Sequence, residues 1–158
     1  MSYEIPTIDQ WIYETLSNDA TLAELLAPDN KPNGYQMGIY NSVAPQIDPV
    51  SRKQVQVPYV VFSSTSQTVI ERSLCNGRFL TDSGYRVTVW DTASGAVSMA
   101  RAQNIMARID TLLDGQTVTS TTPNFFCTRD VAGQSFSLSE GGRTDVAVTA
   151  TYIIQSVE

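Results

Sequence analysis

Two strand-like stretches on either side of an Asn-Gly pair constrain the fold of this chain most. In the first, 57–72, Val57, Tyr59 and Val61 interleave with Val60 and Phe62. In the second, 78–90, Tyr85, Val87 and Val89 alternate with Arg86, Thr88 and Trp90. A period of two is typical of β-strands. Asn76-Gly77 between them favours a tight turn, because both turn positions need positive φ. The sequence therefore predicts a long antiparallel hairpin.

This hairpin is long for the size of the chain. At ~3.4 Å per residue each arm reaches about 45 Å. A compact domain of this length has a radius of gyration of only about 15 Å. We therefore expect the end of the hairpin to project beyond the body of the domain.

The expected hairpin end combines two cations with three large apolar side chains. These candidate interface residues are Arg72, Leu74, Arg78, Phe79 and Leu80. Exposed apolar groups gathered in this way more often mark a contact than a free surface, so we interpret them as a subunit interface. The other interpretation is that the tip folds back and that Leu74 and Phe79 pack locally.

A two-residue turn at Asn76-Gly77 would pair Leu74 with Phe79 and Glu71 with Asp82. Two directly opposed carboxylates are mildly unfavourable. The pattern thus indicates either a different register or cations supplied from elsewhere, such as a neighbouring subunit.

Two helices are expected, one before the hairpin in the sequence and one after it. The first spans Thr7 to Leu26 with an interruption at 17–19, because its large apolar residues recur at helical spacing. Thr7 is its expected cap, and Pro28 ends it. The second follows capping residues in 91–94 and runs to about Leu113, where Asp114-Gly115 stops it. We interpret both apolar stripes as surfaces packed on a sheet.

Further strands are expected at 35–40, at 125–131 before a turn at Gly133, and at 145–154 after a loop at 140–143. The polar stretch 41–56 is interpreted as a surface loop. The order α-β-β-β-α-β-β predicts one α+β domain over residues 1–158. Its expected architecture is an antiparallel sheet of about five strands, with two helices packed on one face and a projecting long β-hairpin.

Composition argues against a nucleic-acid-binding surface. The net charge is −6, from ten Lys+Arg against sixteen Asp+Glu, and Arg52-Lys53 is the only adjacent cationic pair. Phosphate contacts need clustered cations. No apolar run approaches the roughly 20 residues of a membrane span, and residues 1–6 do not resemble a secretory signal. We therefore expect a cytoplasmic protein whose Cys75 and Cys127 are reduced thiols.

Catalytic chemistry has little support in the residue types. The chain has no histidine and only two cysteines, which removes the commonest general base and does not supply the roughly four ligands of a zinc site. No glycine-rich phosphate loop is present. Asp110 and Asp114 lie one helical turn apart, and we interpret them as solvated carboxylates at a helix end, with no aromatic or basic group around them. The prediction is a protein without enzymatic activity, metal or cofactor.

Several stretches, in this order, resemble the tail-completion (tail-terminator) family of siphophages. They are 12–16 with 19–26, then 38–46, 57–62 and 85–91 leading into the long helix. The most specific element is Ile39-Tyr40 with Ala44-Pro45-Gln46, followed by Pro58-Tyr59-Val60-Val61. The resemblance covers roughly residues 8–113. The polar insertion at 47–56 departs from the short link of that family.

The resemblance implies a structural virion protein that acts without catalysis. Such subunits form a hexameric ring that caps the tail tube, ends its polymerisation and joins it to the head. The implied partners are copies of itself, the tail tube protein and a head-completion or connector protein, with DNA passing through the lumen without specific binding. The implied location is the tail or neck of the virion, after assembly in the cytoplasm of a host bacterium.

Two alternatives stay open at this point. The chain could be another tail or neck component, such as a tube subunit or a head-completion protein. It could also be a small cellular homo-oligomeric binding module.

Overall fold

The structure is a computed structural model that describes residues 4–26, 38–44, 52, 55, 57–74, 78–92, 96–119 and 124–157. Within these ranges the side chains are described except at 4–7, 67–81, 96–98, 143 and 157. The elements in chain order are α1 Glu4–Ser17, α2 Ala20–Leu25, β1 Ile39–Asn41, β2 Tyr59–Leu74, β3 Arg78–Thr92, α3 Ala96–Leu113, β4 Gln116–Val118, β5 Asn124–Glu140 and β6 Arg143–Val157.

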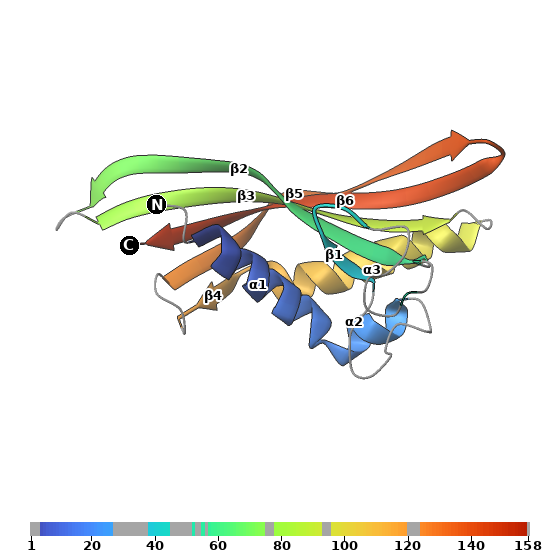
Figure 1. The fold of residues 1–158 in the computed structure, drawn as a ribbon, viewed down its shortest axis with the longest axis horizontal. Helices are drawn as coiled ribbons and strands as arrows, with labels where there is room; N and C mark the ends of the chain where they lie inside the picture. Colours follow the sequence, from blue (N-terminus) through green and yellow to red (C-terminus); the bar gives the residue numbers. More distant parts are fainter. Residues whose placement is uncertain are drawn as a thin grey trace.

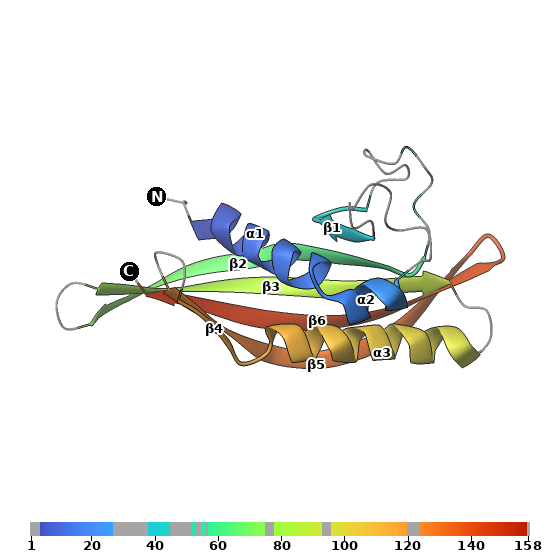
Figure 2. The same cartoon turned by 90° about the horizontal axis from the view of Figure 1, so that it is seen from below.

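The strands form one sheet in the order β1-β2-β3-β6-β5-β4. The helices lie against one face of this sheet (Figures 1 and 2). The α+β class and the one-sided helix layer are thus confirmed. Two details differ from expectation: the described part of the sheet has six strands, and β1 pairs with β2 in parallel. The expected interruption at 17–19 is confirmed, and it divides the first helical segment into the two helices α1 and α2.

The break between α1 and α2 is set by Asp19. Its carboxylate caps α2 by accepting a hydrogen bond of 2.7 Å from the backbone N–H of Leu22, which satisfies an N–H that has no partner inside the helix. Helix α1 begins at Glu4 and not at the expected cap Thr7. Pro6 is compatible with this start, because N–H groups of the first turn have no intrahelical acceptor.

The β2–β3 hairpin forms as expected but in another register. Leu74 lies opposite Arg78 and Ile70 opposite Leu80, with an irregularity on β2 between Ile70 and Leu74. Asp82 therefore faces Thr68. The expected pairs Leu74–Phe79 and Glu71–Asp82 are wrong, because the irregularity shifts the two arms and removes the opposition of carboxylates.

A second long hairpin, formed by β5 and β6, was not expected. Its turn is Gly141-Gly142, where both residues have positive φ, 59° and 80°, as a tight hairpin turn requires. The β2–β3 and β5–β6 hairpins extend toward opposite ends of the sheet (Figure 1). The expected loop at 140–143 is thus the tip of a hairpin whose strands are much longer than predicted.

Gly133 lies within β5 and does not form the predicted turn. A Cβ at this position would lie 3.2 Å from Cγ of Met106 on α3 and 3.2 Å from Cγ1 of Val148 on β6. The glycine therefore allows close packing between the helix and the sheet. In the sequence alone, a glycine with this role looks the same as one that marks a turn.

The core lies between the helix layer and the sheet. Its largest fully buried side chains are Ile8, Ile12, Leu16, Leu22, Ile39, Phe62, Tyr85, Ile105, Ile109, Leu113, Tyr152 and Ile154. Tyr85 also ties β3 to α1, because its hydroxyl donates a hydrogen bond of 2.7 Å to Asp9. Burial raises the pKa of Tyr85, and the hydrogen bond to Asp9 raises it further, so this phenol stays a donor.

One buried polar group is a defect of this core and gives a prediction. Ser83 is fully buried and its hydroxyl has no hydrogen-bond partner. Such a group costs roughly 1–3 kcal/mol, so Ser83→Ala should raise the free energy of unfolding by about 1 kcal/mol, measured by urea denaturation. Ser64→Ala, at an exposed position of β2, is the matched control and should change little. A destabilised Ser83→Ala variant would contradict this prediction.

Candidate interaction surface

The face of the sheet opposite the helices has no covering layer within the described residues (Figures 1 and 2). We call it the outer face. On β3 it carries Asp82, Gly84, Arg86, Thr88 and Trp90, because alternate residues of a strand point to one side and the residues between them belong to the core. The strand register places Ile153, Thr151, Thr149 and Ala147 of β6 on the same face.

An apolar row follows β5 across the outer face. Phe126, Val131, Phe136 and Leu138 are 38%, 40%, 37% and 54% exposed, and they are opposite outer-face positions of β6. Trp90 adds to the row, since its ring meets that of Phe136 edge-on at a centroid distance of 5.8 Å. Large exposed apolar groups gathered on one face typically mark a contact surface.

The sheet also has two long unpaired edges. Strand β1 pairs with β2 only at 60–62, and β4 pairs with β5 only at 125–127. The N–H of Arg129 is taken by Asp114 at 2.7 Å. No described strand pairs with the outer edges of 63–74 on β2 and 130–140 on β5. Unpaired edges are templates for pairing with another chain, and these two lie on opposite margins of the sheet.

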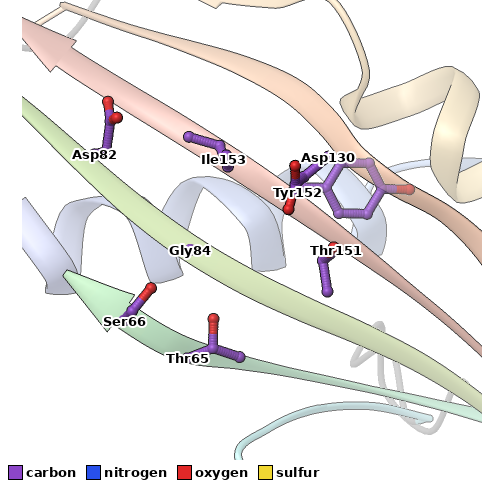
Figure 3. Close-up of a pocket in the computed structure, with 8 residues that line it drawn as sticks. All are labelled: Thr65, Ser66, Asp82, Gly84, Asp130, Thr151, Tyr152 and Ile153. Atoms are coloured by element: carbon purple, nitrogen blue, oxygen red, sulfur yellow. The ribbon is translucent and has the colours of Figure 1, made fainter. Parts of the chain in front are cut away.

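A hollow of about 320 Å³, lined by polar side chains together with Tyr152 and Ile153, lies on the outer face. Its lining includes Thr65, Ser66, Asp82, Gly84, Asp130 and Thr151 (Figure 3). A Cβ on Gly84 would lie 2.7 Å from Oγ of Ser66 and 2.8 Å from Oγ1 of Thr65, so glycine is required for these hydroxyls to sit above β3. The hollow thus combines two carboxylates with small hydroxyl groups.

Two oxygen atoms of this hollow are buried without a hydrogen-bond partner. They are Oδ1 of Asp82 and Oγ1 of Thr151. Buried polar atoms are nearly always paired in folded proteins. The hollow is therefore a place where a donor from outside the chain would relieve an unfavourable environment.

Among the described side chains, Arg86 is the cation of the outer face. It is exposed, and among the described side chains it forms no ion pair. It lies on β3 four residues from Asp82, which is about 13 Å along a strand. This separation is too large for Arg86 to pair with the short Asp82 side chain of its own strand.

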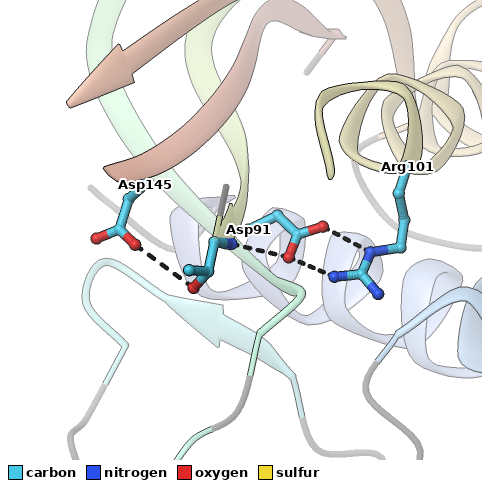
Figure 4. Close-up of polar contacts among 4 residues, drawn as sticks. Asp91, Arg101 and Asp145 are labelled. Carbon is cyan, nitrogen blue, oxygen red and sulfur yellow. Dashed lines mark hydrogen bonds and ion pairs between the residues drawn. The ribbon is translucent and has the colours of Figure 1, made fainter. Parts of the chain in front are cut away.

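The two arginines of α3, in contrast, form ion pairs within the chain. Arg101 of α3 binds the fully buried Asp91 through two hydrogen bonds of 2.6 Å (Figure 4). Asp91 was expected to help cap the helix, but it lies in β3. Arg108 binds Asp19 through bonds of 3.0 and 2.6 Å. These pairs fasten α3 to β3 and to α2.

Asp110 and Asp114 are not the isolated, solvated carboxylates that we expected. Asp110 accepts hydrogen bonds from Arg129 at 2.6 Å and from the hydroxyl of Tyr152 at 3.2 Å, and Asp114 binds the backbone of Arg129. A basic and an aromatic residue thus do surround them. Their arrangement ties the end of α3 to β5 and β6.

Cys127 lies beside these carboxylates, which gives a prediction about its reactivity. Burial raises its pKa to about 12, and the charges of Asp114 and Asp110 contribute. Against a usual value of 9.0, this lowers the thiolate fraction at pH 8 about a thousandfold. In a Cys75→Ser variant, iodoacetamide should alkylate Cys127 at least a hundredfold faster in denaturant than in the native state. Similar rates in both states would contradict this burial.

The five residues predicted as a subunit interface belong to the β2–β3 hairpin. Arg72, Leu74, Arg78, Phe79 and Leu80 have described backbone in β2 and β3, but their side chains lie outside the described residues. The outer face was missed by sequence reasoning. A signal existed: in 135–139, Phe136 and Leu138 alternate with serines, which is a strand pattern.

Two classes of feature are not found in the described part of the chain. None of its helices has the length and apolar character needed to cross a membrane. Nor do these residues contain a group of three or more acidic or cysteine side chains placed to hold a metal ion.

Comparison with known proteins gives a likeness of fold. No protein-family model matches the sequence, and no curated protein does. A chain in a solved structure described as "Virion of native gene transfer agent (GTA) particle" aligns with a TM-score of 0.57 and 17% identity, over 91% of each chain. A second solved chain aligns with a TM-score of 0.50 and 11% identity, over 94% of each. The fold of this chain therefore also occurs in a chain of a gene transfer agent virion.

Proposed function

We propose that this chain is a structural subunit of a phage-like virion. By the sequence resemblance it forms a closed ring of six copies, which caps the tail tube and joins it to the head. The observation that carries the proposal is the likeness of fold to the gene transfer agent virion chain over nearly the whole length of both. The sequence resemblance to tail-terminator proteins gives the finer assignment.

The sheet edges support assembly into a ring. The free edges of β2 and β5 lie on opposite margins of the sheet, so each copy offers different edges to its two neighbours. Contacts of this heterologous kind form rings when the rotation closes. Strands β2 and β5 run in opposite directions, because each successive pair from β2 to β5 is antiparallel. Copies placed side by side would therefore continue the antiparallel pattern.

We also propose that the role is not catalytic. The carboxylates that the sequence offered for acid–base chemistry, Asp110 and Asp114, are engaged in holding β5 and β6. Replacing both with asparagine should lower the free energy of unfolding of the chain. It should not abolish any catalytic activity of the particle.

Electron microscopy and genetics test the proposal. Purified protein, at high concentration or with tail tube protein, should form closed rings and not long tubes. Particles made without a functional copy should carry tails of abnormal length that fail to join heads. Long tubes from the purified chain alone would favour a tube subunit, and normal tails joined to heads in its absence would refute the terminator role.

A further inference from the structure

We infer that the outer face is a self-complementary surface that pairs two copies of this chain face to face, with Arg86 of each copy entering the acidic hollow of the other. This contact goes beyond the ring proposed above and uses different residues. The ring depends on sheet edges, whereas the pairing depends on the centre of the sheet.

The order of charges along β3 supports a second copy as the occupant. Asp82, Gly84 and Arg86 follow one another on the outer face and carry negative, no and positive charge. A twofold axis that lies midway between the two sheets, perpendicular to β3 and level with Gly84, sets the two β3 strands antiparallel across the contact. It then places Arg86 of each copy opposite Asp82 of its partner. Such an isologous contact repeats each favourable pair.

The shape of the surface agrees with this arrangement. Gly84 and the small side chains Thr65, Ser66 and Thr151 leave a hollow where a longer side chain can enter (Figure 3). An arginine has five N–H donors and a long aliphatic stem. The hollow offers it two carboxylates, and one oxygen of Asp82 is buried without a partner.

The apolar row provides the remaining contact area. Face-to-face sheets pack about 10 Å apart with interdigitated side chains. The pairing that brings Arg86 to Asp82 also places Val131, which is level with Arg86, opposite Phe126 of the partner, which is level with Asp82. A covering partner without cations would instead bury Asp82 and Asp130 uncompensated, which is costly.

Charge reversal provides the test. Arg86→Asp places carboxylates opposite Asp82 of the partner, and Asp82→Arg places cations opposite Arg86. Each variant alone should weaken self-association at least a hundredfold. An equimolar mixture of the two should associate again, because one copy then presents two carboxylates and the other two cations. Sedimentation equilibrium measures the association, and circular dichroism checks that each variant is folded.

Two further variants keep the test decisive. Asp82→Lys, which carries the same charge on a slimmer side chain, replaces Asp82→Arg in the mixture if the latter does not fold. Glu24→Arg, exposed on α2 in the helix layer, is the matched control and should associate like the original chain. If Arg86→Asp associates as the original chain does, or if the mixture of folded variants stays monomeric, the inference is wrong. If Arg86→Asp still forms closed rings, the ring proposal holds even where the face-to-face pairing fails.

Discussion

Replacing Arg101 with methionine should lower the free energy of unfolding by about 2–4 kcal/mol. The reason lies in its partner: Asp91 is fully buried, and Arg101 is the cation that neutralises it. Without the guanidinium, the carboxylate keeps only the hydrogen bond of 2.8 Å from the N–H of Thr92 (Figure 4). The expected loss is below the largest values known for buried pairs, since the Arg101 side chain is 43% exposed.

A double variant separates the ion pair from packing. Arg101→Met with Asp91→Asn removes the unpaired charge, so it should recover part of the lost stability. Chemical denaturation of the four proteins in this cycle gives the coupling energy. A coupling energy near zero would mean that Arg101 acts only through the contacts of its aliphatic stem.

Replacing Asp19 with alanine should also destabilise the protein, by about 1–2 kcal/mol from the lost helix cap alone. The variant loses the bond to the N–H of Leu22 and both bonds from Arg108. Both losses affect α2, because Asp19 caps the start of this helix and also joins it to α3. Asp19→Asn can still cap the helix but carries no charge, so it should lie between alanine and the original residue.

The contribution of Asp19 should depend on pH. The hydrogen bond from Arg108 lowers the pKa of this carboxyl below its usual 3.8, and the bond from Leu22 adds to the effect against an opposing contribution from burial. A folded-state pKa below the unfolded one gives stability that is present above about pH 4 and lost as the pH falls through the folded value. The original chain should therefore lose its advantage over Asp19→Asn in acid. Parallel stability curves of the two proteins from pH 7 to pH 3 would contradict this.

The sequence predicted well those elements whose pattern is carried by their own residues. The stripe of Ile8, Ile12 and Leu16 is buried as expected, and so is the alternation of Tyr85, Val87 and Val89. In both cases one face of the element meets the core, so burial leaves a period in the sequence.

The failures occur where a neighbouring element decides the structure. Gly133 suggested a turn, but its small size serves the packing of α3 on β6. The parallel pairing of β1 with β2 leaves no local signature in three residues. The outer face was overlooked because its residues come together only through the pairing of β3, β6 and β5. Arg86 and Asp130 are 44 positions apart by their numbers, and no periodicity links them.

The continuity of the two central strands has a mechanical consequence. Strand β3 pairs with β6 without interruption from Leu80 to Thr92, and each strand continues into a different hairpin at an opposite end of the molecule (Figure 1). Tension applied between the two hairpins would load this ladder in shear, so its hydrogen bonds would have to break together and not one after another. The sheet can therefore transmit a pull along its length while the helices, which lie on one side of it, bear little of the load.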